Sequence, residues 1–94
     1  MNMPKVSKCD AGSCSYNRDG KCHALAITVG DAGHPRCDTY IQMPGRGGDM
    51  SAIAGVGACR VDICRFNQDL ECTAAKIAVA MHSDCPDCAT FRRA

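Results

Sequence analysis

The amino-acid sequence predicts a small metal-stabilised, zinc-finger-like protein, built from two tandem cysteine-rich β-hairpin modules with little regular secondary structure. Three observations lead to this fold class. Nine of the 94 residues are cysteine, which is far above ordinary usage. Trp is absent and only two Tyr and two Phe are present, so apolar burial alone offsets little of the conformational entropy lost on folding. The third observation is an internal repeat, which divides eight of the cysteines into two sets of four.

The repeat relates residues 9–40 to residues 59–91, with one residue inserted in the second copy. The cysteine spacing is C-x4-C-x7-C-x14-C in the first copy and C-x4-C-x7-C-x15-C in the second. Such self-similarity indicates two copies of one structural unit. We therefore expect a first cysteine-rich repeat over residues 6–40, a Gly-rich linker over residues 41–57 and a second repeat over residues 58–92. The run PGRGGD within the linker is typical of a flexible connector.

Each repeat carries the signals of a hairpin turn followed by a strand. Asn17 and its neighbours favour a turn between the second and third cysteines, because Asn, Asp and Gly stabilise turns. The second copy has Leu70 where the first has Gly20, so we do not expect both copies to require a tight Asp-Gly turn. Apolar residues then alternate with smaller ones over residues 25–29 and 75–81, which predicts a strand in both copies. The Ala content of the second copy leaves a helix as the alternative there.

The four shared cysteines of each repeat make one complete tetrahedral zinc site, so two zinc ions are predicted, one per repeat. A structural zinc site contributes enough free energy to fold a domain of this size. The spacing differs from the usual C-x2-C pairs, which makes the pattern more specific for a cysteine-dependent fold than for zinc itself. Disulfide bonding remains the alternative, in particular for an exported protein. The predicted ligands are Cys9, Cys14, Cys22, Cys37, Cys59, Cys64, Cys72 and Cys88.

The ninth cysteine, Cys85, lies in the run CPDC with Cys88 and aligns with His34 of the first copy. A redox-active dithiol is disfavoured, because the flanking Asp84 and Asp87 would raise a thiol pKa and no βαβ unit surrounds the pair. Cys and His share the role of zinc ligand, so His34 and Cys85 are candidates for auxiliary or alternate ligands.

Two other histidines differ between the copies. His23 and His82 align with Thr73 and Ala32, so we expect both to be surface residues and not ligands.

Charge and motif content exclude several classes of function. The formal net charge of +1 does not favour nucleic acid as a partner. The sequence contains no apolar run of membrane-span length and no apolar leader in MNMPKVSKCD, so we expect no membrane association and a cytoplasmic location. No constellation of catalytic residues is recognisable, so we expect neither an enzyme nor an organic cofactor. A protein partner is expected, but its identity and the oligomeric state are not encoded in any recognisable motif.

The run C-x4-C-x-[YF]-N-x4-C-x-A-x2-I-x-V, closed by C-x-T-[YF], resembles the small bacterial domain of unknown function 1540 (DUF1540). Both copies carry it, from Cys14-Ser15-Tyr16-Asn17 to Cys37-Asp38-Thr39-Tyr40 and from Cys64-Arg65-Phe66-Asn67 to Cys88-Ala89-Thr90-Phe91. The resemblance implies a short bacterial protein with four characteristic cysteines per copy that bind metal, and it implies no activity. Cys85 lies outside that set of four.

These observations predict a zinc-binding interaction or scaffold module whose cellular role is not evident from the sequence. A metal-handling or thiol redox-buffering protein, similar to metallothionein, is the alternative. A disulfide-stapled small domain is the third possibility.

Overall fold

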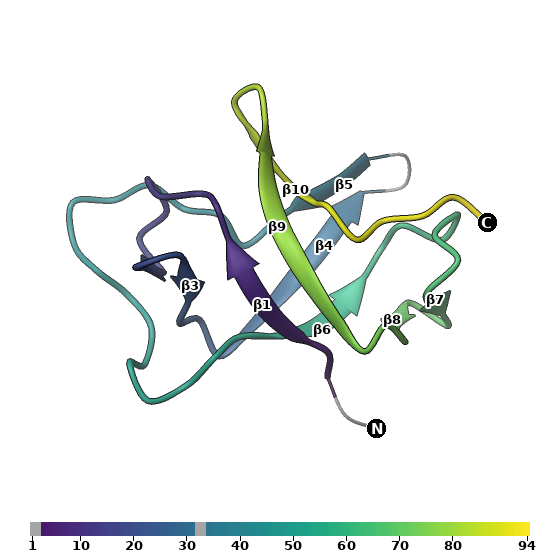
Figure 1. Cartoon of the computed structure of the whole chain (residues 1–94), viewed down its shortest axis with the longest axis horizontal. Helices are drawn as coiled ribbons and strands as arrows, with labels where there is room; N and C mark the ends of the chain where they lie inside the picture. The colour runs from purple at the N-terminus through teal and green to yellow at the C-terminus, as the bar shows by residue number, and fades with distance from the viewer. Residues whose placement is uncertain (1–2, 32–33) are drawn as a thin grey trace.

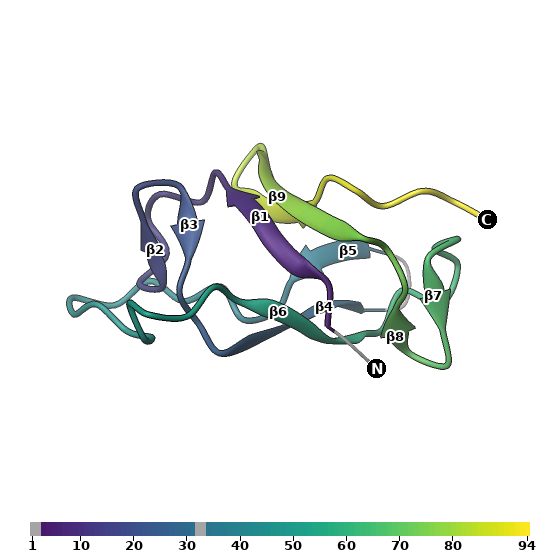
Figure 2. The same ribbon diagram turned by 60° about the horizontal axis from the view of Figure 1, so that its bottom comes forward.

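Both repeats contribute strands to one closed barrel, with a short hairpin at each end of the molecule (Figures 1 and 2). The computed structural model describes residues 3–31 and 34–94, and none of these residues forms a helix. The strands in order around the barrel are β1 (Lys5–Cys9), β6 (Gly55–Cys59), β4 (Ala26–Asp31), β5 (His34–Cys37), β10 (Cys85–Cys88) and β9 (Lys76–His82). The two hairpins are β2–β3 (Asn17–Arg18 and Lys21–Cys22) and β7–β8 (Asn67–Gln68 and Glu71–Cys72).

The first barrel strand of each repeat pairs with the long strand of the other repeat. Strand β1 runs parallel to β9, which places Cys9 beside Val79, and β6 runs parallel to β4, which places Cys59 beside Val29. The antiparallel pairs β1–β6 and β5–β10 join equivalent strands of the two copies. The two expected hairpin modules are therefore intertwined, because the hydrogen bonds that close the barrel run between the copies.

The barrel interior is built from apolar residues that the repeat relates in pairs. The alternating pattern that predicted strands is confirmed by β4 and β9, and the helical alternative for the second copy is wrong. Alternation puts every second side chain on the inner face of a strand. Both copies therefore contribute valine and isoleucine side chains of similar size to the interior. Each of the following is at most 3% exposed: Val6, Val56, Ile27, Ile77, Val29 and Val79.

The same left-handed turn closes both outer hairpins, contrary to the expectation from sequence. Asp19 and Gly20 have φ values of 55° and 80°, and Asp69 and Leu70 have φ values of 55° and 67°. The second copy thus places a leucine in a conformation that disfavours a Cβ atom by about 1–2 kcal/mol. The surrounding hydrogen bonds hold the turn in spite of this cost, because Leu70 N donates to Asn67 Oδ1 at 3.2 Å.

The segment between the repeats is attached to the first repeat, although its sequence is typical of a flexible connector. Ser15 N donates to Ile41 O at 2.7 Å, and Ala54 N donates to Cys22 O at 3.0 Å. His23, expected at the surface, is instead 6% exposed beneath this segment, with Nδ1 2.8 Å from Ala52 O. The final residues of the predicted linker form the start of β6. Backbone hydrogen bonds, which composition does not reveal, therefore hold the connector in place.

The one-residue difference between the copies is absorbed by an irregularity in β4. The register between β4 and β5 shifts between Val29 and Asp31, whereas β9 and β10 pair in one register throughout. Gly30 lies at the shift with φ of +83°. A Cβ atom there would overlap Val61 Cγ2 and lie 3.0 Å from His34 O. The first copy therefore depends on glycine at this position.

Candidate metal centres

The four shared cysteines of the first repeat, here called the first cysteine set, line one small cavity of about 10 Å³. Its members come from separate elements, at the ends of β1, β3 and β5 and in the loop before β2. All four side chains are buried, with 6–7% exposure. The predicted ligands are thus brought together, although as many as 28 positions separate them along the sequence. The set comprises Cys9, Cys14, Cys22 and Cys37.

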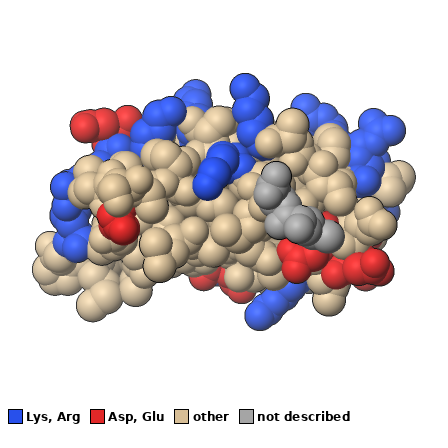
Figure 3. Space-filling model, turned by 90° about the horizontal axis from the view of Figure 1, so that it is seen from below, with Lys and Arg blue, Asp and Glu red and all other residues tan. Residues whose placement is uncertain are grey.

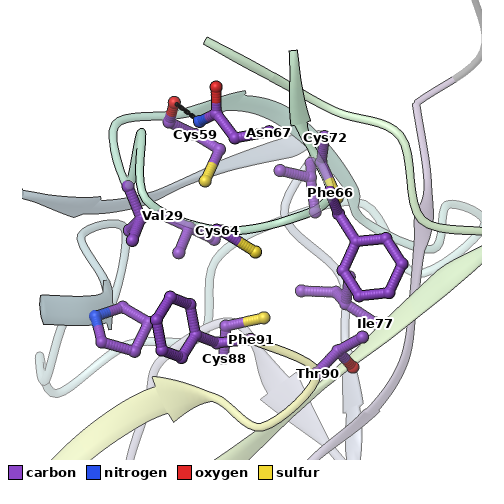
Figure 4. A pocket seen from close by; sticks show the side chains of 13 residues that line it. Val29, Cys59, Cys64, Phe66, Asn67, Cys72, Ile77, Cys88, Thr90 and Phe91 are labelled. Carbon is purple, nitrogen blue, oxygen red and sulfur yellow. Dashed lines mark hydrogen bonds between the residues drawn. The ribbon is translucent and has the colours of Figure 1, made fainter. Parts of the chain in front are cut away.

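The second repeat repeats this arrangement around a cavity of about 20 Å³. Figure 4 shows the sulfur atoms of the second cysteine set turned toward a shared space, beside Phe66 and Phe91. Cys72 and Cys88 are partly exposed, so this site is slightly more open than the first. The second set comprises Cys59, Cys64, Cys72 and Cys88.

Each cavity is completed by residues of the opposite repeat. Val79 and Pro86 of the second repeat line the cavity of the first cysteine set, and Val29 and Pro35 of the first repeat line the cavity of the second. This reciprocity follows from the strand exchange, because each first cysteine lies beside a valine from the other copy. The two candidate centres are therefore parts of one folded unit.

Burial raises the pKa of two thiols in each set, those of Cys22 and Cys37 in the first and of Cys72 and Cys88 in the second. Desolvation raises the pKa of Cys37 to about 11, while the backbone N–H groups of Thr39 and Tyr40 act in the opposite direction. Neighbouring thiols of the same set raise the pKa of Cys37 further. In the second copy, desolvation is likewise the main cause that raises the pKa of Cys88, again to about 11. Each set thus concentrates donors that a cation would convert to thiolates.

Backbone N–H groups are already directed at the sulfur atoms that would carry this charge. The N–H of Ala24 lowers the pKa of Cys22, and the N–H of Ala74 does so for Cys72, although burial outweighs both and each pKa is raised. Hydrogen bonds to a thiolate stabilise its charge and tune a metal that it binds. The local fold therefore provides backbone N–H groups that donate to sulfur atoms of each set.

The donor chemistry of both sets suits a tetrahedral ion, but binding requires the sulfur atoms to draw together. Zinc bound to four thiolates at about 2.3 Å requires sulfur atoms about 3.8 Å apart. The sulfur atoms surround the cavity without three of them lying within 4.8 Å of one another in either set. Some pairs must therefore approach by at least about 1 Å on binding, and the cavity between them provides the space for this movement.

The asparagine of each turn connects the outer hairpin to the first cysteine of its set. Asn17 Nδ2 donates to Cys9 O at 2.8 Å, and Asn67 Nδ2 donates to Cys59 O at 2.8 Å. This explains the shared Asn in structural terms, because one side chain both shapes the turn and positions a ligand-bearing residue.

The two additional donors lie apart from both cysteine sets and close to each other. His34 Nε2 is 3.3 Å from Cys85 Sγ and 3.0 Å from Asp87 Oδ1, and Cys85 Sγ donates to Asp87 Oδ1 at 3.1 Å. Within residues 3–31 and 34–94, these three side chains form the group whose ligand atoms all lie within 4.8 Å of one another. Sequence reasoning did not identify Asp87 as a ligand. The available signal was a break in the repeat, since Asp87 aligns with Arg36.

The CPDC run does not form a dithiol pair. Residues 85 and 88 occupy the two ends of β10, and side chains three apart on a strand point to opposite faces. Their Cα atoms are separated by about 10 Å, beyond the 7 Å limit for a disulfide. The geometry thus agrees with the sequence argument against a redox motif.

Fold and sites together define a small, strand-rich, cysteine-rich protein with two related clusters of thiols. A family model described as Domain of Unknown Function (DUF1540) matches residues 8–42 and again residues 58–91. The chain belongs to this family and contains two copies of its domain. Comparisons with curated proteins and with solved structures give no significant match. None of the described segments forms a helix of the length and hydrophobicity needed to cross a bilayer.

Proposed function

We propose that this protein is a zinc-binding interaction or scaffold module, in which each cysteine set holds one structural zinc ion. The observation that carries the proposal is the convergence of each set of four cysteines on one small cavity. Four thiolates suit zinc in a closed tetrahedral site, in which all four coordination positions are taken by the protein. We infer no enzymatic role for the two cysteine sets on this ground.

The sparse core supports a structural role for the metal. The largest fully buried side chains are Ile, Val and Pro, and the aromatic rings are only partly buried around them. A zinc ion would join four chain segments that the apolar core alone holds weakly, and such sites contribute about 10–16 kcal/mol in zinc-finger peptides. The ion thus supplies stability that a chain of this composition lacks.

A protein partner fits the surface better than nucleic acid does. Figure 3 shows a face with a broad uncharged area, which is bordered mainly by basic side chains along its upper edge and by acidic side chains at the lower right. Interfaces between proteins have a core depleted in charge and a polar rim. The formal net charge of +1 lacks the basic excess that is typical of nucleic-acid binders. A cytoplasmic location in a bacterial cell is part of the same proposal, since reduced thiols persist there.

Native mass spectrometry together with a thiol count tests the proposal. We expect two zinc ions that survive buffer exchange, with all cysteines recovered as thiols after removal of the metal. Cys14→Ser and Cys64→Ser should each release one of these ions. A metal-free protein whose mass is lower by two protons per cysteine pair would establish the disulfide alternative and refute the zinc proposal.

Metal handling is the second candidate function, favoured by the partial exposure of Cys72 and Cys88. Transfer of zinc to a coloured chelator distinguishes it from a structural role. If zinc is structural, both ions leave at the rate of unfolding. If the protein handles metal, the ion of the second cysteine set leaves much faster than the chain unfolds.

A further inference from the structure

A third cluster of potential metal ligands joins the two repeats at the contact between β5 and β10. We propose that His34, Cys85 and Asp87 form a separate site for a divalent transition-metal ion, with zinc as the preferred metal. The contacts between their ligand atoms are 3.0, 3.1 and 3.3 Å. This proposal is independent of the two cysteine sets, because it uses none of their residues.

The directions of the contacts favour a metal over a catalytic relay. In a Cys-His-Asp relay the thiol and the carboxylate contact different nitrogens of the imidazole ring. Here both contacts converge on the same atom, His34 Nε2. Three unlike donor atoms that all point to one location make a coordination site, and imidazole, thiolate and carboxylate are the three ligand types that zinc accepts.

The ligand spacing is close to that of a tetrahedral zinc site. Zinc–ligand bonds of about 2.0–2.3 Å place nitrogen, oxygen and sulfur ligands about 3.3–3.6 Å from one another. The observed contacts are only a few tenths of an ångström shorter, so the ion requires a slight widening of the cluster. In the two cysteine sets, by contrast, the sulfur atoms must move closer together to bind an ion.

Charge and burial also favour a cation at this position. The side chain of Asp87 is only 13% exposed, whereas that of His34 is 50% exposed. A carboxylate and a thiolate in contact repel each other unless a positive charge separates them. His82 Nδ1 lies 3.7 Å from Asp87 Oδ2 and is well exposed. Three protein ligands with one side open to water describe an exchangeable site rather than a closed structural one.

The repeat accounts for the origin of the cluster. His34 and Cys85 occupy equivalent positions in the two copies, and the strand exchange brings these positions together although they are 51 residues apart. The β5–β10 contact has a single registered pair, Asp87 with Arg36. An ion at this point would cross-link the copies at one of the two barrel contacts that have a single registered pair, the other being β1–β6. Occupancy of the third site therefore couples metal concentration to the stability of the whole barrel.

Titration of the full-length chain with zinc, followed by native mass spectrometry, tests the proposal. We expect the wild type to bind one more zinc ion than His34→Ala, Cys85→Ser and Asp87→Asn under the same conditions, and this ion should be lost on buffer exchange. Loss of one ligand should weaken its binding by more than about 100-fold, since even loss of a group that only hydrogen-bonds to a ligand costs about 10–100-fold. Arg36→Ala is the matched control, because it alters the same strand pair and removes no ligand.

Cobalt substitution gives a readout that does not depend on ion counts. With zinc already bound to both cysteine sets and cobalt added afterwards, a thiolate charge-transfer band should appear in the wild type and in Arg36→Ala, and should not appear in Cys85→Ser. Far-UV circular dichroism of the half-exposed His34→Ala variant shows whether the fold is retained.

The outcomes separate this proposal from that of the cysteine sets. Equal ion counts in the wild type and in all three ligand variants, at every zinc concentration, would overturn the third site. A wild type that binds one ion while the ligand variants bind none would support the third site and refute zinc binding by the cysteine sets.

Discussion

Replacement of Gly30 by alanine should be the most destabilising single-methyl change among the glycines of the barrel. Gly30 has φ of +83°, where an alanine is disfavoured by about 1–2 kcal/mol. The added Cβ would also overlap Val61 Cγ2 in the buried interior. Overpacking of this kind costs about 1–3 kcal/mol. We therefore expect Gly30→Ala to lower the free energy of unfolding by about 2–5 kcal/mol.

Two further variants separate the conformational cost of Gly30→Ala from its overpacking cost. Gly20 has nearly the same φ, +80°, but nothing lies within 4 Å of the position of its Cβ. Gly20→Ala should therefore show the conformational cost alone, about 1–2 kcal/mol. Val61→Ala removes the overlapping methyl group, so the double variant Gly30→Ala/Val61→Ala should be more stable than the sum of the single effects by about 1–3 kcal/mol.

Urea unfolding of the four variants, in one buffer of fixed zinc concentration, provides the measurement. The other half of the barrel supports the expectation, because the residues that align with Gly30 and Val61 are Ala80 and Ala11. The reasoning would be refuted if Gly30→Ala cost no more than Gly20→Ala, or if the double variant were additive within about 0.5 kcal/mol.

Three further changes test the turns and the thiols. After removal of metal, the contribution of Cys37 and Cys88 to stability should be constant up to about pH 9 and should be lost as the pH rises toward 11, because folding raises their pKa values from 9.0 to about 11. Thermal melts in chelator between pH 8 and 11 measure this loss, and a rise in stability over that range would contradict it. Leu70→Asn should raise the free energy of unfolding in urea by about 0.5–1 kcal/mol, because Asn tolerates the left-handed conformation better; a lower free energy of unfolding would count against strain at this exposed position. Asn67→Ala should cost about 1–3 kcal/mol, since its amide makes hydrogen bonds of 2.8 and 3.2 Å; an unchanged unfolding curve would show that neither bond contributes.

Much of the local structure could be predicted because both copies encode it in short segments. The turn after Asn17, the strand through Ile27 and Val29, and the grouping of cysteines all follow from spacing that recurs in the second copy. The predictions that failed depend on contacts outside the segment. His23 is buried only because the connector folds over it, and Leu70 adopts a glycine-like conformation only because the turn around it is fixed.

In the candidate sites, too, features set by short-range spacing could be predicted and long-range contacts could not. The four cysteines of each set could be identified from the repeat, but their cavity walls could not, because Val79 and Val29 belong to the opposite copies. Asp87 joined a cluster for which the sequence suggested only His34 and Cys85. Contact between residues 51 positions apart depends on strand partners, which a single sequence does not specify.

The two copies, the two sets of four cysteines and the strands and turns that carry them could be predicted, because these features depend on residue type and short-range spacing. The pairing of β1 with β9 and of β6 with β4 became evident from the folded chain. Backbone hydrogen bonds between strands are the same for almost any residue, so side-chain identity hardly distinguishes one partner strand from its repeat equivalent. That choice of partner, made by the packing of the whole chain, joins the two cysteine sets into one barrel and brings His34 to Cys85.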